Sequence, residues 1–116
     1  MNKKIYANKT EQGDIRLTPG EFIGKTGPSG LPITSVTLSR MGSTFLWFSD
    51  FLNGSESGPV EHPAGDKTYQ AIRNSDAVFL QEIRGNRMAS CVGFSQAEIP
   101  SVLAQFQSAM AKAMQE

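Results

Sequence analysis

The last third of the chain, residues 77–114, constrains the fold more than any other part of the sequence. Two largely apolar stretches flank Gly85-Asn86, a dipeptide that favours a two-residue turn between antiparallel strands. Ser95 follows the second stretch, and Glu98 stands three residues later, which is the spacing of a helix capping box. Apolar residues then recur every three or four positions over the rest of the segment. The sequence therefore predicts a β-hairpin that leads directly into an amphipathic helix.

The predicted hairpin spans residues 77–94, and its register follows from the turn. With unbroken pairing, the opposed residues are Arg84 and Arg87, Ile83 and Met88, Leu80 and Cys91, Phe79 and Val92, and Ala77 and Phe94. This register collects large apolar side chains on one face, namely Ala77, Phe79, Ile83, Met88, Val92 and Phe94. We expect the helix to pack on that face, with Phe106 against Phe79 and Val92.

Shorter strands are predicted in the first half of the chain, where β-branched and alternating apolar residues lie between Gly- and Pro-rich turns. Residues 44–52 are rich in aromatic side chains and are expected to form a hairpin with residues 33–40 through a turn at 41–43. The Gly- and Pro-rich residues 53–67 predict a long irregular loop. The predicted strands are residues 3–7, 14–18, 21–25, 33–40 and 44–52.

Together these elements predict an α+β fold in which an antiparallel sheet of several strands is followed by one C-terminal amphipathic helix packed on one sheet face. The length of 116 residues fits a single domain over 1–116. As a strand, residues 44–52 would have two apolar faces, because Phe45, Trp47 and Phe51 alternate with Leu46, Phe48 and Leu52. One helix covers only one face, so the other must meet N-terminal strands, a second subunit or stacked bases. We expect a homodimer.

Charge and composition narrow the classes of function. Eleven basic and eleven acidic residues give a formal net charge of zero, so the whole chain lacks an overall attraction to polyanions. No stretch has the length of a membrane span, and the first residues lack the apolar region of a signal peptide. A single cysteine excludes an internal disulfide. These features predict a cytoplasmic protein without membrane association.

No complete catalytic, metal or nucleotide motif is present. Gly24-Lys25-Thr26 lacks the correctly spaced first glycine of a phosphate-binding loop, and Gly27-Pro28 prevents the helix that must follow it. One histidine excludes a cluster of histidine ligands, and Cys91 lies in an apolar strand that is typical of a buried thiol. We therefore expect no enzyme, metal site or cofactor. An enzyme would need a deep polar pocket around Glu61, His62 and Asp66.

The order of several antiparallel strands followed by an amphipathic helix, over residues 33–114, resembles that of the small single-stranded nucleic-acid-binding proteins of the PC4, Pur-α and Whirly type. The resemblance lies in the architecture. In that group a curved sheet presents aromatic and basic side chains to unpaired bases, whereas this chain has no net positive charge. The resemblance implies a small binding protein whose partner is single-stranded DNA or RNA. It implicates a nucleic-acid-binding site formed by Arg40, Trp47, Arg84 and Arg87.

The alternative is a small protein-binding adaptor or inhibitor of the kind that phages and mobile elements encode, which covers the surface of a protein partner. The zero net charge favours this class. The positions of the basic residues separate the two hypotheses, because a basic face beside exposed rings favours nucleic acid and a scattered set favours a protein partner. The residues that decide are Arg40, Arg84 and Arg87, together with Lys3, Lys4 and Lys25.

Overall fold

A computed structural model describes residues 4–115 of the chain. Two antiparallel sheets, ordered β1-β2-β3 and β4-β5-β6-β7, are combined with two helices. The predicted α+β class with antiparallel strands is confirmed, although the sequence predicted one helix only. The strands are β1 (Ala7–Lys9), β2 (Ile15–Leu17), β3 (Val36–Leu38), β4 (Val60–Ala64), β5 (Lys67–Arg73), β6 (Ala77–Arg84) and β7 (Arg87–Ser95). The helices are α1 (Thr44–Asn53) and α2 (Ile99–Ala113), which follow the 3-10 turns η1 (Met41–Ser43) and η2 (Gln96–Glu98).

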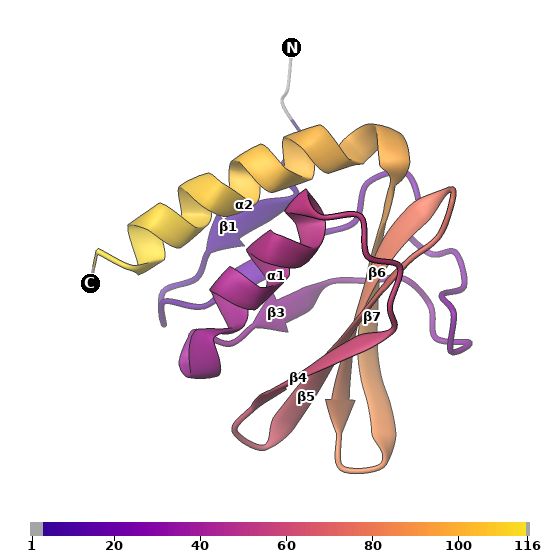
Figure 1. The fold of residues 1–116 in the computed structure, drawn as a ribbon, viewed down its shortest axis with the longest axis horizontal. Helices are drawn as coiled ribbons and strands as arrows, with labels where there is room; N and C mark the ends of the chain where they lie inside the picture. Colours follow the sequence, from indigo (N-terminus) through magenta and orange to yellow (C-terminus); the bar gives the residue numbers. More distant parts are fainter. Residues whose placement is uncertain (1–3, 116) are drawn as a thin grey trace.

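Both helices lie on the same side of the sheets and pack on each other (Figure 1). α2 runs along β1 of the three-stranded sheet, and α1 lies between α2 and the four-stranded sheet (Figure 1). The two hairpins of the four-stranded sheet extend past the helices, so their turns lie beyond the helical layer (Figure 1). The core fills the space between helices and sheets, where Phe48, Phe94 and Phe106 are fully buried.

Residues 44–52, predicted as a strand, form most of α1. The prediction was wrong because six of the nine residues in the segment are apolar and four of them are consecutive, which hides the period of the pattern. In the helix, Phe45, Phe48 and Leu52 follow at three- and four-residue steps and are buried on one face, whereas Leu46 is 50% exposed. The segment therefore does not have the two apolar strand faces on which the expected homodimer rested.

The C-terminal hairpin forms with the predicted turn, and the pairs Arg84–Arg87 and Ile83–Met88 are confirmed. Beyond them a β-bulge leaves Ala89 without an opposed residue, so that each residue of β6 pairs one position further along β7 than predicted. The predicted pairs Leu80–Cys91, Phe79–Val92 and Ala77–Phe94 are wrong, and the observed pairs are Leu80–Val92, Phe79–Gly93 and Ala77–Ser95.

The bulge also exchanges the two faces of β6. Val78 and Leu80 are fully buried in the core, whereas Phe79 lies on the opposite face near Gly93 and Ile33. The predicted core face containing Phe79 is therefore wrong for this strand. Phe106 does not anchor on Phe79 but packs edge-on against Phe45 and Phe48, with ring centroids 6.3 and 5.5 Å apart.

The predicted loop over residues 53–67 is irregular only in its first half, because β4 and the start of β5 occupy the rest. Pro63 argued against a strand in the sequence, but β4 is an edge strand, where a missing backbone N–H is tolerated. In the first half of the chain, β1, β2 and β3 overlap or adjoin the predicted strands 3–7, 14–18 and 33–40. Residues 21–25 form turns rather than a strand, and Lys3 lies outside the described residues.

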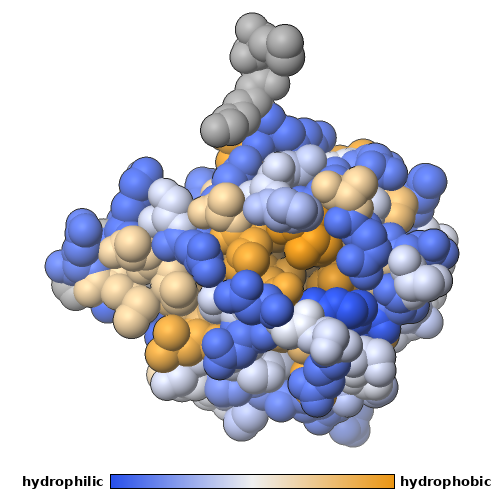
Figure 2. Space-filling view, turned by 45° about the horizontal axis from the view of Figure 1, so that its top comes forward, coloured by the Kyte–Doolittle hydropathy of each residue, from blue (hydrophilic) through white to orange (hydrophobic). Residues whose placement is uncertain are grey.

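α2 begins as predicted. The Ser95 backbone N–H donates to Glu98 Oε1 across 2.9 Å, which completes the capping box, and Pro100 lies in the first turn of the helix. Within residues 4–115, no helix has both the length and the apolarity to span a membrane. Figure 2 shows apolar surface at the centre and at the left of the helical side, crossed by hydrophilic side chains.

Candidate functional site

On the helix-facing side of the four-stranded sheet, the side chains change along the strands from apolar to polar and then to basic. The cross-strand row of Val60, Ala71, Leu80 and Val92 belongs to the core. Two residues further along each strand, on the same face, the row consists of His62, Tyr69, Glu82 and Ser90. The last row before the turns is Ala64, Lys67, Arg84 and Arg87. The free end of the sheet therefore carries three cationic side chains on neighbouring strands. We call Lys67, Arg84 and Arg87 the basic row.

Arg84 is the anchored member of the basic row. Its Nε lies 2.6 Å from Glu82 Oε2, and the Glu82 side chain is only 8% exposed. The hydrogen bond and charge of Glu82 raise the pKa of Arg84 above its ordinary value. Among the described residues, neither the Lys67 nor the Arg87 side chain makes a hydrogen bond or ion pair. Glu82 thus offsets one of the three positive charges, and the other two stay available to an anion.

Tyr69 connects this sheet to the segment that precedes α1. Its fully buried hydroxyl donates to the Thr37 carbonyl oxygen across 2.8 Å and accepts from the Ser39 N–H across 3.0 Å. Burial raises the pKa of Tyr69 to about 12. These two hydrogen bonds hold the backbone just before Arg40 against β5.

Trp47 of α1 and His62 of β4 form an aromatic pair at the border of the core. Their rings stack with centroids 5.1 Å apart and planes 21° apart. His62 Nε2 lies 2.6 Å from the Gly42 carbonyl oxygen, and because a carbonyl only accepts, Nε2 donates the hydrogen. Trp47 is half-buried on α1. Trp47 therefore lies, partly accessible, beside His62, and His62 stands in the row before the one that contains Lys67.

Of the four residues predicted for the site, Arg84 and Arg87 are paired at the turn end of the four-stranded sheet, and Trp47 lies on α1, stacked on His62 of β4. Arg40 is exposed on the neighbouring segment, with Nη1 3.4 Å from the Gln12 carbonyl oxygen and packed on Gly13. The lysines do not join them. Lys4 lies in the groove between β1 and α2, and Lys25 lies over the ring of Phe22 at 5.3 Å.

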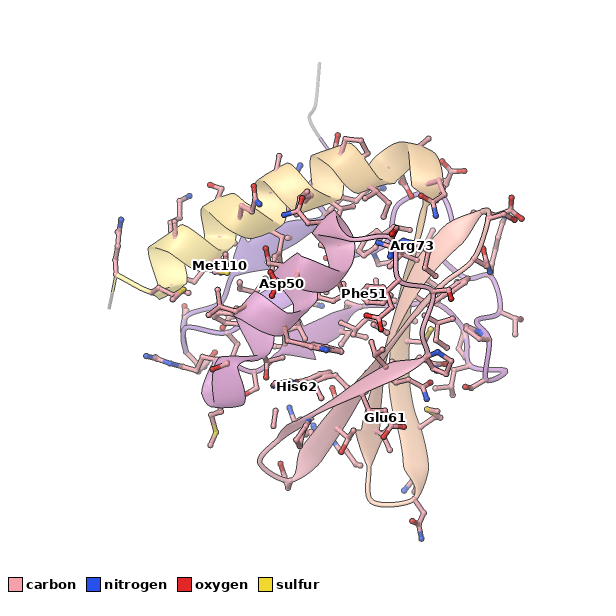
Figure 3. All side chains as sticks on the ribbon, in the orientation of Figure 1. Asp50, Phe51, Glu61, His62, Arg73 and Met110 are labelled. Carbon is pink, nitrogen blue, oxygen red and sulfur yellow. The ribbon has the colours of Figure 1, made fainter. Side chains whose placement is uncertain are left out.

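Sequence reasoning missed Lys67 and His62 because residues 53–67 were assigned to a loop. The missed signal is the alternation of Val60, His62 and Ala64, followed by Gly65-Asp66 as a second two-residue turn. Glu61 and His62 are adjacent in a strand, so their side chains point to opposite faces (Figure 3). Glu61 and His62 therefore do not converge on one pocket, which is the arrangement that an enzyme at these residues would need.

The only cysteine of the chain lies in the protein interior. Cys91 is fully buried, its Sγ would clash with any side chain at Gly27, and burial raises the pKa of the thiol to about 11. The described residues contain no group of three or more His, Cys, Asp or Glu side chains arranged to hold a metal ion.

Comparison of the chain with protein-family models, curated proteins and solved structures gave no match.

Proposed function

We propose that the protein binds single-stranded nucleic acid on the helix-facing side of the free end of the four-stranded sheet. The observation that carries this proposal is the basic row on three neighbouring strands, one row away from the Trp47–His62 pair. Lys67, Arg84 and Arg87 contact backbone phosphates, and the accessible part of Trp47 stacks on a base. Proteins that bind single strands combine these two elements, a cationic path for the backbone and an aromatic platform for the bases.

The order of elements supports the same function. Antiparallel strands followed by a helix occur twice in the chain, as β1–β3 with α1 and as β4–β7 with α2. The second of these, strands followed by the C-terminal helix, is the order on which the resemblance to the PC4, Pur-α and Whirly type rests. In contrast to that group, the basic row occupies only one end of one sheet, and the net charge of the chain is zero. Because Glu82 offsets the charge of Arg84, the two uncompensated cations Lys67 and Arg87 predict a salt slope of about −1.4 for the logarithm of the affinity on a single strand.

The proposal is tested by fluorescence anisotropy of a labelled oligothymidylate at several salt concentrations. The variant Lys67→Ala/Arg87→Ala removes two cations and leaves the Arg84–Glu82 pair intact, so we expect weaker binding and a salt slope shallower by about 1.4. The control Arg16→Ala/Lys25→Ala removes the same charge from other parts of the surface and should keep the parental slope. An equal loss in both variants, or no binding by the parent at low salt, would contradict the proposal.

Protein binding is the second candidate function, and exposed apolar side chains on the helical layer favour it. Leu46 and Met114 are 50% and 60% exposed and line one hollow between the helix ends, and Met110 is partly exposed one helical turn before Met114. We call these three residues the methionine patch. Flexible methionine side chains are typical of surfaces that bind other proteins. Leu46→Glu would abolish binding of a protein at this patch and leave binding at the basic row unchanged, which separates the two functions.

A further inference from the structure

The methionine patch lies where the start of α1 meets the end of α2. A hollow of about 300 Å³ opens between these helix ends. Its volume equals that of about ten water molecules in the liquid, which leaves room for an apolar side chain from outside. The residues around it are Arg40, Ser43, Phe45, Leu46, Ala113 and Met114. The patch therefore combines protruding apolar side chains with a space that such a side chain can fill.

The charged groups next to the patch have opposite signs and lie on opposite sides of Leu46. Arg40 borders the hollow just before α1 begins, and Asp50 lies one helical turn after Leu46 on the same helix face. Figure 3 shows Asp50 and Met110 in the space between α1 and α2. The Asp50 carboxylate is exposed and makes no hydrogen bond or ion pair with residues 4–115. The Arg40 guanidinium makes only the long hydrogen bond to Gln12 within the same residues.

We propose that a second copy of this chain covers the methionine patch and that the protein is a two-fold symmetric dimer. The axis passes near Leu46, so the two α1 helices lie antiparallel across the interface. Arg40 of each copy then faces Asp50 of the other, and this charge pair forms twice. Each Leu46 side chain enters the hollow of the opposite copy.

Charge complementarity selects a second copy over an unrelated protein. In a two-fold interface one surface must complement itself, and a cation and an anion on opposite sides of an apolar centre meet this condition. Antiparallel α1 helices also bring their dipoles into a favourable relative orientation. The formal net charge of zero removes long-range repulsion between copies. The basic row lies on the free end of the four-stranded sheet, so the dimer leaves it accessible.

Charge reversal tests the pairing. Arg40→Glu places a carboxylate of one copy against the Asp50 carboxylate of the other, and Asp50→Arg places two guanidinium groups against each other. Each variant alone should therefore dissociate at least about tenfold more readily than the parent. An equimolar mixture of the two variants restores an opposite-charge pair and should form a heterodimer in preference to either homodimer. Sedimentation equilibrium measures all three samples. The control Asp76→Arg reverses an exposed charge away from the patch and should dimerise like the parent.

A cross-link locates the axis independently of charge. Because the only native cysteine, Cys91, is buried, Leu46→Cys introduces a single accessible thiol. Under mild oxidation we expect a covalent dimer on a non-reducing gel, whereas Ala97→Cys, exposed at the other end of α2, should stay monomeric. A monomeric parent at high micromolar concentration overturns the proposal. Failure of the mixture to form a dimer, or equal cross-linking of both cysteine variants, also overturns it.

Discussion

The Tyr6 hydroxyl donates a hydrogen bond to Glu98 Oε2 across 3.0 Å, although the two residues are 92 positions apart. The same carboxylate accepts from the Glu21 N–H across 3.1 Å and, through its other oxygen, from the Ser95 N–H. A Cβ added at Gly20 would overlap Oε2. Glu98 therefore joins the N-terminal segment, the loop after β2, the end of β7 and the start of α2.

We expect Glu98→Ala to lower the free energy of unfolding by about 2 to 4 kcal/mol. The substitution removes three hydrogen bonds to a nearly buried carboxylate and leaves the Ser95 N–H without its acceptor. Urea denaturation measures the change. Glu98→Gln, which keeps one carbonyl oxygen, should recover part of the loss, and a variant as stable as the parent would show that the four segments are held together by other contacts.

Tyr69 makes stability depend on pH in the alkaline range. Its pKa is raised to about 12 in the folded protein, from 10.0 for an ordinary tyrosine. The unfolded chain therefore loses the hydroxyl proton first, so the stability that Tyr69 contributes is complete below pH 10 and is lost as the pH rises towards 12. We expect Tyr69→Phe to cost about 1 to 3 kcal/mol at neutral pH, because the Ser39 N–H loses its acceptor.

Denaturation of the parent and of Tyr69→Phe at increasing pH measures this effect. The difference in the free energy of unfolding between the two proteins should shrink between pH 10 and 12. Tyr6, whose pKa is also raised by burial and by Glu98, remains in both proteins and cancels from the difference. A difference that stays constant to pH 12 would mean that the Tyr69 hydroxyl ionises as easily in the fold as in the unfolded chain.

Arg73 secures the end of α1. Its guanidinium donates to the carbonyl oxygens of Phe51 and Glu56 across 2.7 and 2.6 Å and lies over the Phe51 ring at 4.7 Å (Figure 3). We expect Arg73→Ala to cost about 1 to 3 kcal/mol and to speed hydrogen exchange in residues 53–59. Arg73→Lys, which keeps the charge but not the fork of donors, should restore little. Unchanged exchange in that segment would argue against this capping role.

Local signals predicted the C-terminal part of the fold well. The Gly85-Asn86 turn and the Ser95–Glu98 capping box each depend on a few neighbouring residues, and both form as expected. The bulge at Ala89 could not be anticipated in this way, because alternating residues fit the hairpin with or without one extra residue. The helical state of residues 44–53 depends on burial against α2, an element that lies far away in the sequence.

In the candidate site, too, residues related by a local signal were predicted, whereas residues that come together only through the tertiary structure were missed. Arg84 and Arg87 were found together because the turn between them fixes their pairing. Lys67 was missed because it lies opposite Arg84 only through the pairing of β5 with β6, which no short motif encodes. The pairing of Trp47 with His62 likewise depends on how α1 lies against β4, so the tertiary structure was needed to place the Trp47 ring on the ring of His62.

Phe106 reports on the helix–helix contact. It is fully buried between Phe45 and Phe48, so we expect Phe106→Ala to lower the free energy of unfolding by about 3 to 5 kcal/mol. Leu103→Ala, at a half-buried position of the same helix, serves as the control and should cost less. Chemical denaturation compares the two variants, and equal midpoints would show that α2 does not depend on this aromatic cluster.

Trp47 separates base stacking from phosphate contact in the proposed nucleic-acid interface. Trp47→Ala removes the ring but no charge, so it should weaken binding of oligothymidylate by about 1 to 3 kcal/mol and leave the salt slope unchanged. As the only tryptophan, Trp47 also reports binding directly, since a stacked base quenches its fluorescence. The Lys67→Ala/Arg87→Ala variant should show the reverse pattern, with a shallower slope and retained quenching at saturation. If Trp47→Ala changed the slope instead, or if saturating oligonucleotide left the fluorescence unaltered, the bases would have to bind away from Trp47.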